Sequence, residues 1–351
     1  MIALKKYIIP VSLLLIILFW LVRWQPDRHD VHTTTQLAMG TLVSLSVWGT
    51  KPENEEKVFA AVFEKIRQLE AVASRQDVNS IVYRINHAPS GEKFTIPSEL
   101  THIVAKGLQV HLLSGGAFDP GLAHISDLWG FTQGVPEVEK IPEKRLIDAW
   151  LEKRKQCFDY GIHLKLPDND SDGPGLLWLA DDSFALDLGA IAKGYILDQA
   201  MAVLKREGII NALIVGGGDM IIAGAKGDQP WRIGIQHPRD RDKVMASVEV
   251  LQDMALATSG DYERFFMADG QRQHHILDPK TGHPARSGLI SVSIQAREAM
   301  IADALSTAVF VLGMEKGKAL IERLEGVEGM LVQENGERWK SSRFPGQWLE
   351  E

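Results

Sequence analysis

The stretch that decides the fold is Ala185-Leu-Asp187-Leu-Gly-Ala190-Ile-Ala-Lys193-Gly-Tyr195, where a strand-like segment meets a glycine turn and then a helical pattern. Small residues at positions 189, 190, 192 and 194 let a ligand or a second backbone approach closely. Asp187 precedes the helix, where a carboxylate either caps the helix or accepts a hydrogen bond from a ligand. Lys193 is able to reach a phosphate as a point charge. On spacing alone, a capped helix with a solvated lysine explains the stretch equally well.

Outward from this stretch, helices and strands mix without a regular strand-helix-strand alternation. Apolar residues at helical spacing predict the helices Glu53–Val72, Leu100–Leu113 (capped by Ser98), Arg145–Lys155, Ile191–Glu207, Ala296–Leu312 and Glu315–Leu324. Strands are predicted at Leu37–Trp48, Gly161–Leu166, Ala212–Ile222, Trp231–Gln236, Leu289–Ile294 and Val327–Gln333, with hairpin elements at Leu176–Leu188 and Met245–Ala257. This order predicts an α+β fold, a single domain with mixed sheets and flanking helices.

The N-terminus has the pattern of an export signal or a membrane anchor. Lys5 and Lys6 precede an apolar run, Tyr7–Val22, which is near the short limit for spanning a bilayer. We expect an uncleaved signal-anchor with the following domain outside a bacterial inner membrane, facing the periplasm or the cell exterior. Cleavage at an atypical site is the alternative. The predicted organisation is an anchor at 1–23, a tether at 24–35, the folded domain at 36–345 and a tail at 346–351.

Composition excludes two classes of protein. The chain of 351 residues has a formal net charge of -8 and no long cluster of Lys and Arg, so nucleic acid is not an expected partner. Its single cysteine, Cys157, cannot form an intramolecular disulfide or a thiolate zinc site.

Three further clusters carry polar groups suited to chemistry. Gly216-Gly-Gly-Asp219 follows an apolar strand and forms either a plain turn or a phosphate-facing loop. His275 precedes the turn sequence Asp278-Pro-Lys-Thr-Gly282 and is a candidate general base, or a histidine that fills a hydrogen bond in the core. Asp303 and Thr307 are four residues apart on one helix face and offer the hard oxygen ligands that magnesium prefers. Alone, each cluster has an ordinary structural explanation.

Taken together and in order, the clusters resemble the ApbE family of FAD:protein FMN transferases. The resemblance rests on Met39-Gly-Thr41, Gly116-Ala-Phe-Asp-Pro120, Leu128-Trp-Gly-Phe131, Asp187 to Gly194, Gly217-Gly-Asp219, Trp231 to Pro238, Thr258 to Tyr262, His275 to Pro279 and Asp303 to Thr307. It covers nearly everything after the tether.

The resemblance implies a role for each matching residue. The FAD-binding residues would be Met39, Ala117, Phe118, Asp119, Asp187, Lys193 and Leu277. The magnesium ligands would be the Ala190 carbonyl, Asp303 and Thr307, and the catalytic residues would be His275, Lys193 and Asp303. Family members transfer FMN from FAD to a Thr or Ser hydroxyl of a target protein through a phosphodiester and release AMP. The expected partners are therefore FAD, Mg²⁺ and an acceptor protein, for example a subunit of a membrane redox pump.

Two departures from the family pattern affect this interpretation. Ser306 stands where some members carry Asp, so the metal site has one formal charge fewer. Gln76 falls where an aromatic residue commonly lies near the flavin. Two alternatives to the transferase remain: an FAD pyrophosphatase that uses water as nucleophile and yields FMN and AMP, and a flavin-binding protein without catalysis.

Overall fold

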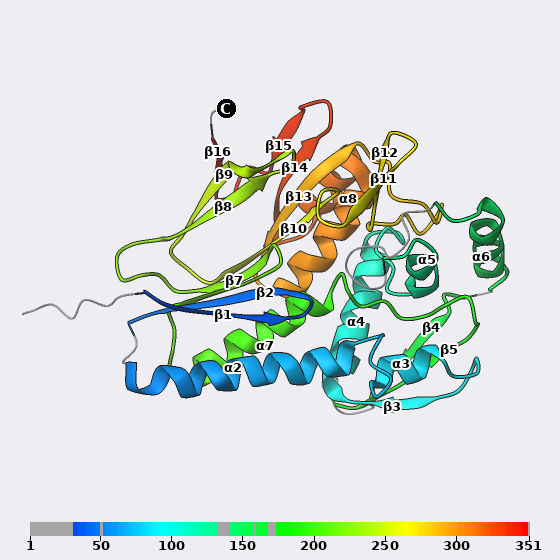
Figure 1. The fold of residues 1–351 in the computed structure, drawn as a ribbon, viewed down its shortest axis with the longest axis horizontal. Helices are drawn as coiled ribbons and strands as arrows, with labels where there is room; N and C mark the ends of the chain where they lie inside the picture. Colours follow the sequence, from blue (N-terminus) through cyan, green and yellow to red (C-terminus); the bar gives the residue numbers. More distant parts are fainter. Residues whose placement is uncertain (1–30, 50–51, 132–140, 158, 168–172, 350–351) are drawn as a thin grey trace, which may run out of the picture.

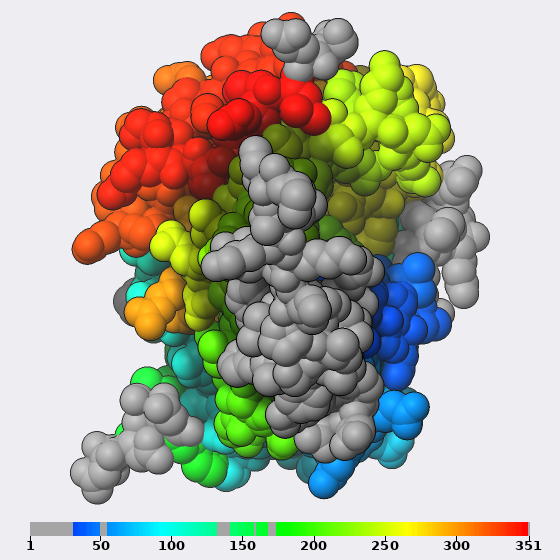
Figure 2. Space-filling model, turned by 90° about the vertical axis from the view of Figure 1, so that its left-hand side faces the viewer, coloured from blue at the N-terminus to red at the C-terminus, as the bar shows by residue number. Residues whose placement is uncertain are grey.

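The computed structural model describes residues 31–49, 52–131, 141–157, 159–167 and 173–349. The predicted anchor and most of the tether lie outside these residues. Among the described residues, none of the helices combines the length and the apolar character that a membrane crossing requires. The two described ends of the chain lie toward the same side of the molecule. Figure 2 shows this side, with the blue N-terminal elements at the right and the red C-terminal strands at the top.

An eight-stranded sheet forms the centre of the fold (Figure 1). Its strands in spatial order are β1 (Val31–Ala38), β2 (Thr41–Trp48), β6 (Ala212–Gly216), β7 (Asp219–Ala223), β10 (Met254–Gly260), β13 (Leu289–Ala296), β14 (Glu328–Gln333) and β15 (Arg338–Lys340). Each neighbouring pair is antiparallel. Segments far apart in sequence therefore meet side by side, as β7 and β10 do.

The two faces of this sheet are both buried, against different partners. Alternate residues of β10 point in opposite directions, so Ala255 and Ala257 join the larger core while Met254 and Leu256 join a second core. Helices α7 (Ala192–Arg206) and α8 (Ala299–Arg323) cover the first face. The second face packs on a three-stranded sheet made of β8 (Trp231–His237), β9 (Asp240–Val250) and β16 (Gly346–Trp348). The result is a three-layer arrangement of sheet, sheet and helices.

The remaining elements extend the helical layer. Helix α2 (Pro52–Ala73) lies along α7, and α4 (Ser98–Leu113) contacts α8 (Figure 1). A small sheet holds β3 (Phe94–Ile96), β5 (Gly175–Leu179) and β4 (Ile162–Lys165), next to α3 (Ile81–Asn86). Helices α5 (Ala123–Leu128) and α6 (Lys144–Gln156) share a third apolar cluster with the hairpin of β11 (Phe265–Ala268) and β12 (Gln271–His274).

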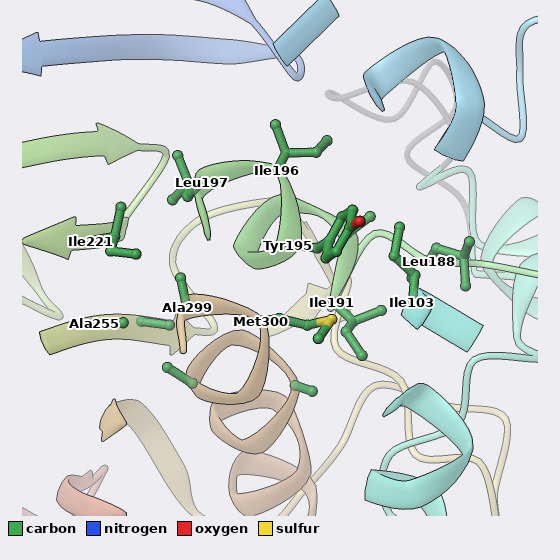
Figure 3. Packing of buried hydrophobic residues seen from close by; sticks show 14 of the residues in the cluster. Ile103, Leu188, Ile191, Tyr195, Ile196, Leu197, Ile221, Ala255, Ala299 and Met300 are labelled. Carbon is green, nitrogen blue, oxygen red and sulfur yellow. The ribbon is translucent and has the colours of Figure 1, made fainter. Parts of the chain in front are cut away.

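Helices α7 and α8 meet closely at their N-terminal ends (Figure 3). A Cβ atom at Gly194 would lie 2.3 Å from the carbonyl oxygen of Ala299, so only glycine fits there. Within α8, Gly313 has φ 81 and ψ 179, which interrupts the helix. This interruption falls between the two predicted helices that end at Leu312 and begin at Glu315, so the predicted break is confirmed.

Several predictions about the strands were wrong. The expected mixed sheets are not found, because every pair of named strands in the described residues is antiparallel. The predicted strand Ala212–Ile222 is the hairpin of β6 and β7, since Gly217 and Gly218 take positive φ values of 62 and 98 and reverse the chain. The predicted hairpin Met245–Ala257 is divided between two sheets, because β9 pairs with β8 and β10 with β7.

Boundaries also differ from the predictions. Strand β1 begins at Val31, inside the predicted tether, and pairs with β2 along its whole length. Strand β16 lies inside the predicted tail and pairs with β9, because Trp348 packs against the second core. At the start of α4, the capping position belongs to Pro97, and the Ser98 hydroxyl bonds Glu99 rather than the helix amides.

Candidate active site

A lysine held by two buried carboxylates forms the centre of the candidate site. Lys193, the second residue of α7, donates to the Asp219 carboxylate and lies 3.3 Å from Asp303 Oδ1. Asp219 follows the glycine turn between β6 and β7, and Asp303 comes from the second turn of α8. Both aspartates are almost fully buried, with exposed fractions of 2% and 3%. The fold thus brings Lys193 together with Asp219, 26 positions away in the chain, and with Asp303, 110 positions away.

The charges of this centre depend on one another. Burial acts to lower the pKa of Lys193, but the Asp219 and Asp303 carboxylates outweigh burial and hold that pKa above its ordinary value. Burial, together with the neighbouring Asp219, raises the pKa of Asp303. Lys193 therefore stays charged at neutral pH, while the Asp303 carboxyl loses its proton less readily than an exposed carboxyl would.

Glu263 and Arg264 add one charge of each sign beside the centre. The side chains of both residues are exposed to solvent. Each ionisable group nevertheless has many protein atoms around it, and this partial desolvation shifts its pKa. Burial raises the pKa of Glu263 to about 7, against the opposing effect of Lys193. The Glu263 carboxylate lies against the glycine turn, 3.2 Å from where a Cβ atom of Gly218 would stand. Burial also lowers the pKa of Arg264, against the attraction of Asp187.

Two tight turns lie next to each other at this end of the sheet. Met39 has φ 53 in the turn between β1 and β2, an unusual conformation for a residue with a side chain. Its Cε atom lies 3.2 Å from the position that a Cβ atom of Gly216 would take, and Thr41 is similarly close to Gly217. The predicted FAD-binding Met39 is therefore placed beside the glycine turn that leads into Asp219.

His275 lies next to the cationic groups of the site and is half-buried. Its Nδ1 atom is 3.2 Å from the carbonyl oxygen of Arg264, an acceptor that selects the tautomer with the proton on Nδ1. Burial, then the charges of Arg264, His274 and Lys193, hold the pKa of His275 well below its ordinary value. The imidazole is therefore neutral at pH 7, and its other ring nitrogen is free of a proton, as a general base requires.

Asp187 does not cap the helix. The capping position of α7 belongs to Ile191, whereas Asp187 Oδ1 accepts a hydrogen bond from the amide of Gly189 at 3.1 Å. Its other oxygen lies 3.4 Å from Nε of Arg75. Arg75 also donates to Asp127 at 2.6 Å and thereby links the loop after α2 to α5. The predicted FAD-binding Asp187 thus pairs with the Arg75 guanidinium, and its charge also acts to raise the pKa of Arg264.

The predicted FAD-binding stretch Ala117–Asp119 directs its side chains into the protein. Phe118 is buried in the main core, and Asp119 accepts hydrogen bonds from Arg154 and Tyr160, each at 2.5 Å. The residue that follows the stretch reaches the site through its backbone, because the carbonyl of Pro120 accepts a 2.8 Å hydrogen bond from the amide of Asp187. Contacts of residues 117–119 with a ligand would therefore come from main-chain atoms.

Leu277 is also buried, with an exposed fraction of 5%, in the third apolar cluster. It lies two residues after His275, in the turn region that Trp129 fixes by donating to the carbonyl of Gly282 at 2.7 Å. This packing orients the backbone that carries His275.

The oxygen atoms predicted to hold magnesium gather where α7 and α8 meet. In a regular first turn the amide of Gly194 would face the carbonyl of Ala190, but it donates instead to Asp303 Oδ2 at 3.2 Å. The Ala190 carbonyl and the Asp303 carboxylate therefore lie at the same end of α7. Thr307 is on the face of α8 that carries Asp303, and its hydroxyl is 3.3 Å from the Ser259 hydroxyl. Ser306 points to the same Ser259 at 2.7 Å.

This donor set fits a hard divalent cation. Carboxylate, hydroxyl and carbonyl oxygens are the ligands that Mg²⁺ prefers, usually with substrate phosphates completing its shell. Three carboxylates, Asp219, Glu263 and Asp303, surround one lysine, so the site has room for further positive charge. Within the described part of the chain, no group of three or more His, Cys, Asp or Glu side chains is arranged to hold a metal by itself.

The structure brings together most of the predicted site residues. Lys193, Asp303 and Met39 gather at the end of the sheet where β6 and β7 turn. His275 is bonded to the Arg264 carbonyl, and Asp187 pairs with Arg75. Sequence reasoning missed Glu263, Arg264 and Arg75 and gave no role to Asp219. The signal for the first two was their position directly after the Thr258–Tyr262 stretch.

Curated relatives that match most of the chain are named FAD:protein FMN transferase, so the chain is an enzyme of the transferase class. The chain belongs to the ApbE family, whose model matches residues 39–331. It is 34% identical over 317 residues to the FAD:protein FMN transferase of Treponema pallidum (strain Nichols), covering 87% of this chain and 85% of that relative.

Solved structures agree with this assignment. The crystal structure of the ApbE protein from Thermotoga maritima superimposes with a TM-score of 0.77 at 33% identity, covering 89% of this chain and 97% of the other. The flavinyl transferase ApbE of Pseudomonas stutzeri, in its apo form, gives a TM-score of 0.73 at 30% identity, with 90% and 96% covered.

Proposed function

We propose that this chain transfers FMN from FAD to a Thr or Ser hydroxyl of a target protein, in a reaction that depends on Mg²⁺ and releases AMP. The proposal is supported by the relatives named FAD:protein FMN transferase, which match most of the chain. The observation that carries it is Lys193, held by the buried carboxylates of Asp219 and Asp303, together with His275, whose Nδ1 faces the Arg264 carbonyl. This combination suits the attack of a hydroxyl on a negatively charged phosphate.

The reaction exchanges one phosphorus-oxygen bond for another. The acceptor hydroxyl oxygen forms a bond to the phosphorus of the FMN half of FAD, and the bond from that phosphorus to the AMP oxygen breaks. His275 accepts the hydroxyl proton on the ring nitrogen that does not face the Arg264 carbonyl. Lys193, positioned by Asp219 and Asp303, offsets the negative charge that moves onto AMP. Bound Mg²⁺, held by Asp303, Thr307 and the Ala190 carbonyl, would supply further neutralisation of the pyrophosphate.

The proposed setting of the reaction is a membrane surface. Residues 1–23 would anchor the chain in a bacterial inner membrane, and the folded part would face the periplasm or the cell exterior. An acceptor in the same membrane, such as a redox-pump subunit, would then be within reach of the site. The support for this setting is the charged and apolar pattern of Lys5 to Val22.

A labelling experiment tests the proposal. The protein is incubated with FAD, Mg²⁺ and membrane vesicles from the source cells, and denatured proteins are separated on a gel. We expect a band with flavin fluorescence, and a peptide from it with one FMN attached to Thr or Ser. AMP formed without any labelled protein would indicate hydrolysis of FAD, and FAD bound without products would indicate a flavin-binding protein. Either result contradicts the proposal.

A further inference from the structure

Helix α8, which carries Asp303 and Thr307, begins without a cap of its own. Glu298 holds the capping position, and its side chain makes no capping hydrogen bond. Asp198 of α7 takes over this function. Its Oδ1 and Oδ2 atoms accept hydrogen bonds from the amides of Ala299 at 2.8 Å and Met300 at 3.0 Å. One carboxylate from a neighbouring helix thus satisfies two of the free amides at the start of α8.

At the start of α7, a backbone amide is likewise satisfied by a carboxylate of the other helix, α8. The side chain of Ile191 at the capping position cannot accept a hydrogen bond, and Asp303 of α8 accepts one from the amide of Gly194 at 3.2 Å. The two helices therefore exchange carboxylates: Asp198 caps α8, and Asp303 contacts the first turn of α7. Each contact fixes the position of one helix end relative to the other.

Close packing leaves little freedom for any other arrangement. The first turn of α8, marked by Ala299 and Met300, lies against the turns of α7 that carry Tyr195 and Ile196 (Figure 3). Gly194 lies against the Ala299 carbonyl without room for a Cβ atom. Asp198 is half-buried at this contact, where burial raises the pKa of its carboxyl to about 6 although the two amide hydrogen bonds act to lower it. The contact lies one to two helical turns from Lys193, Asp303 and Thr307.

We propose that Asp198 is a positioning residue for the cation and phosphate site. By holding the first turn of α8 against α7, it fixes the separation between the Ala190 carbonyl end of α7 and the Asp303 and Thr307 oxygens of α8. Asp198 itself touches neither the metal ligands nor the lysine in the contacts described above. The inference rests on the proposed function for the identity of the cation and of the phosphate substrate.

Calorimetric titration of Mg²⁺ into the FAD-saturated protein tests this role. Asp198→Ala removes both acceptors, and Asp198→Asn keeps one, so the asparagine variant serves if the alanine variant does not fold. Asp253→Asn is the matched control, because Asp253 also accepts from a backbone amide, that of Gly224 at 2.9 Å, and contacts Lys205 in the last turn of α7. The dissociation constant of FAD without Mg²⁺ and the dependence of the transfer rate on Mg²⁺ concentration are measured in parallel.

We expect Asp198→Ala to weaken Mg²⁺ binding about tenfold, the change that roughly 1.4 kcal/mol gives, and Asp198→Asn to fall between it and the wild type. FAD affinity without Mg²⁺ should not change, and transfer at saturating Mg²⁺ should return close to the wild-type rate. Unaltered Mg²⁺ affinity in both variants, even with lower thermal stability, overturns the inference, as does a wild-type chain that binds no Mg²⁺. Intact Mg²⁺ binding without FMN transfer contradicts the proposed function alone.

Discussion

Replacing Lys193 by Met removes the one lysine that contacts two buried carboxylates within the described residues, while keeping the length of the side chain. In the folded protein Lys193 contacts Asp219 and Asp303, which are 2% and 3% exposed. Removal of one partner from a buried ion pair leaves an uncompensated charge and typically costs about 3–5 kcal/mol. The free energy of unfolding at pH 8 should therefore fall by roughly that amount.

The pH dependence of the loss follows from the sign of the pKa change. Without the ammonium group, the pKa of Asp303, already raised by burial, rises further. A carboxyl group whose pKa is higher in the folded than in the unfolded state loses stability as the pH rises. The deficit of Lys193→Met should thus be largest at pH 8 and shrink at pH 6.

Urea unfolding followed by circular dichroism at both pH values measures this deficit. Lys205→Met is the matched control on the same helix, because Lys205 pairs with Asp253 at 2.6 Å on the surface, where such a pair contributes only about 0–1 kcal/mol. A loss for Lys193→Met no larger than that of the control, and equal at pH 6 and pH 8, would refute the interpretation of Lys193 as the compensating charge of a buried centre.

Three further predictions concern the site and its support. His275→Ala should lower FMN transfer by about 10²–10⁴-fold with unchanged FAD affinity; a near-normal rate in single-turnover assays would remove His275 from the reaction. Asp303→Ala should abolish Mg²⁺-dependent turnover, because Asp303 is the only side-chain carboxylate among the proposed ligands; full AMP release with Mg²⁺ would place the metal elsewhere. Burial lowers the pKa of His274 in the folded protein to about 4. As the pH falls, His274 therefore takes up its proton in the unfolded state before it does so in the folded state. The free energy of unfolding should therefore drop by about 2 kcal/mol between pH 7 and pH 5. His274→Gln should lose this drop in urea titrations, and an unchanged slope would exclude His274 as its source.

The helices were predictable because amphipathic spacing is a local property. The predicted helix Ile191–Glu207 is α7, Ala192–Arg206, and Glu53–Val72 is α2, Pro52–Ala73. Strand pairing depends on contacts between segments far apart in the chain, so it was harder to predict from the sequence. The glycines at 217 and 218 indicated a turn, but only the fold shows that this turn separates β6 from β7 and directs Asp219 toward Lys193.

Candidate site residues were proposed where they form motifs and were missed where only geometry connects them. Asp303 and Thr307 share a helix face, which their spacing predicted, but only the resemblance to the family gave them a common role. The contact between Lys193 and Asp219 joins α7 to a strand turn, and neither residue predicts the other. Asp198 was missed for the same reason, since its partners are backbone amides 101 and 102 residues away.

The central claim is that this site transfers FMN rather than hydrolysing FAD, and counting both products tests it most directly. AMP released and flavin covalently attached are quantified together in one reaction with FAD, Mg²⁺ and membrane vesicles from the source cells. The account predicts one flavin attached to Thr or Ser for each AMP released, and neither product with Asp303→Ala. AMP released in large excess over attached flavin, or in equal amounts with and without vesicles, would contradict it.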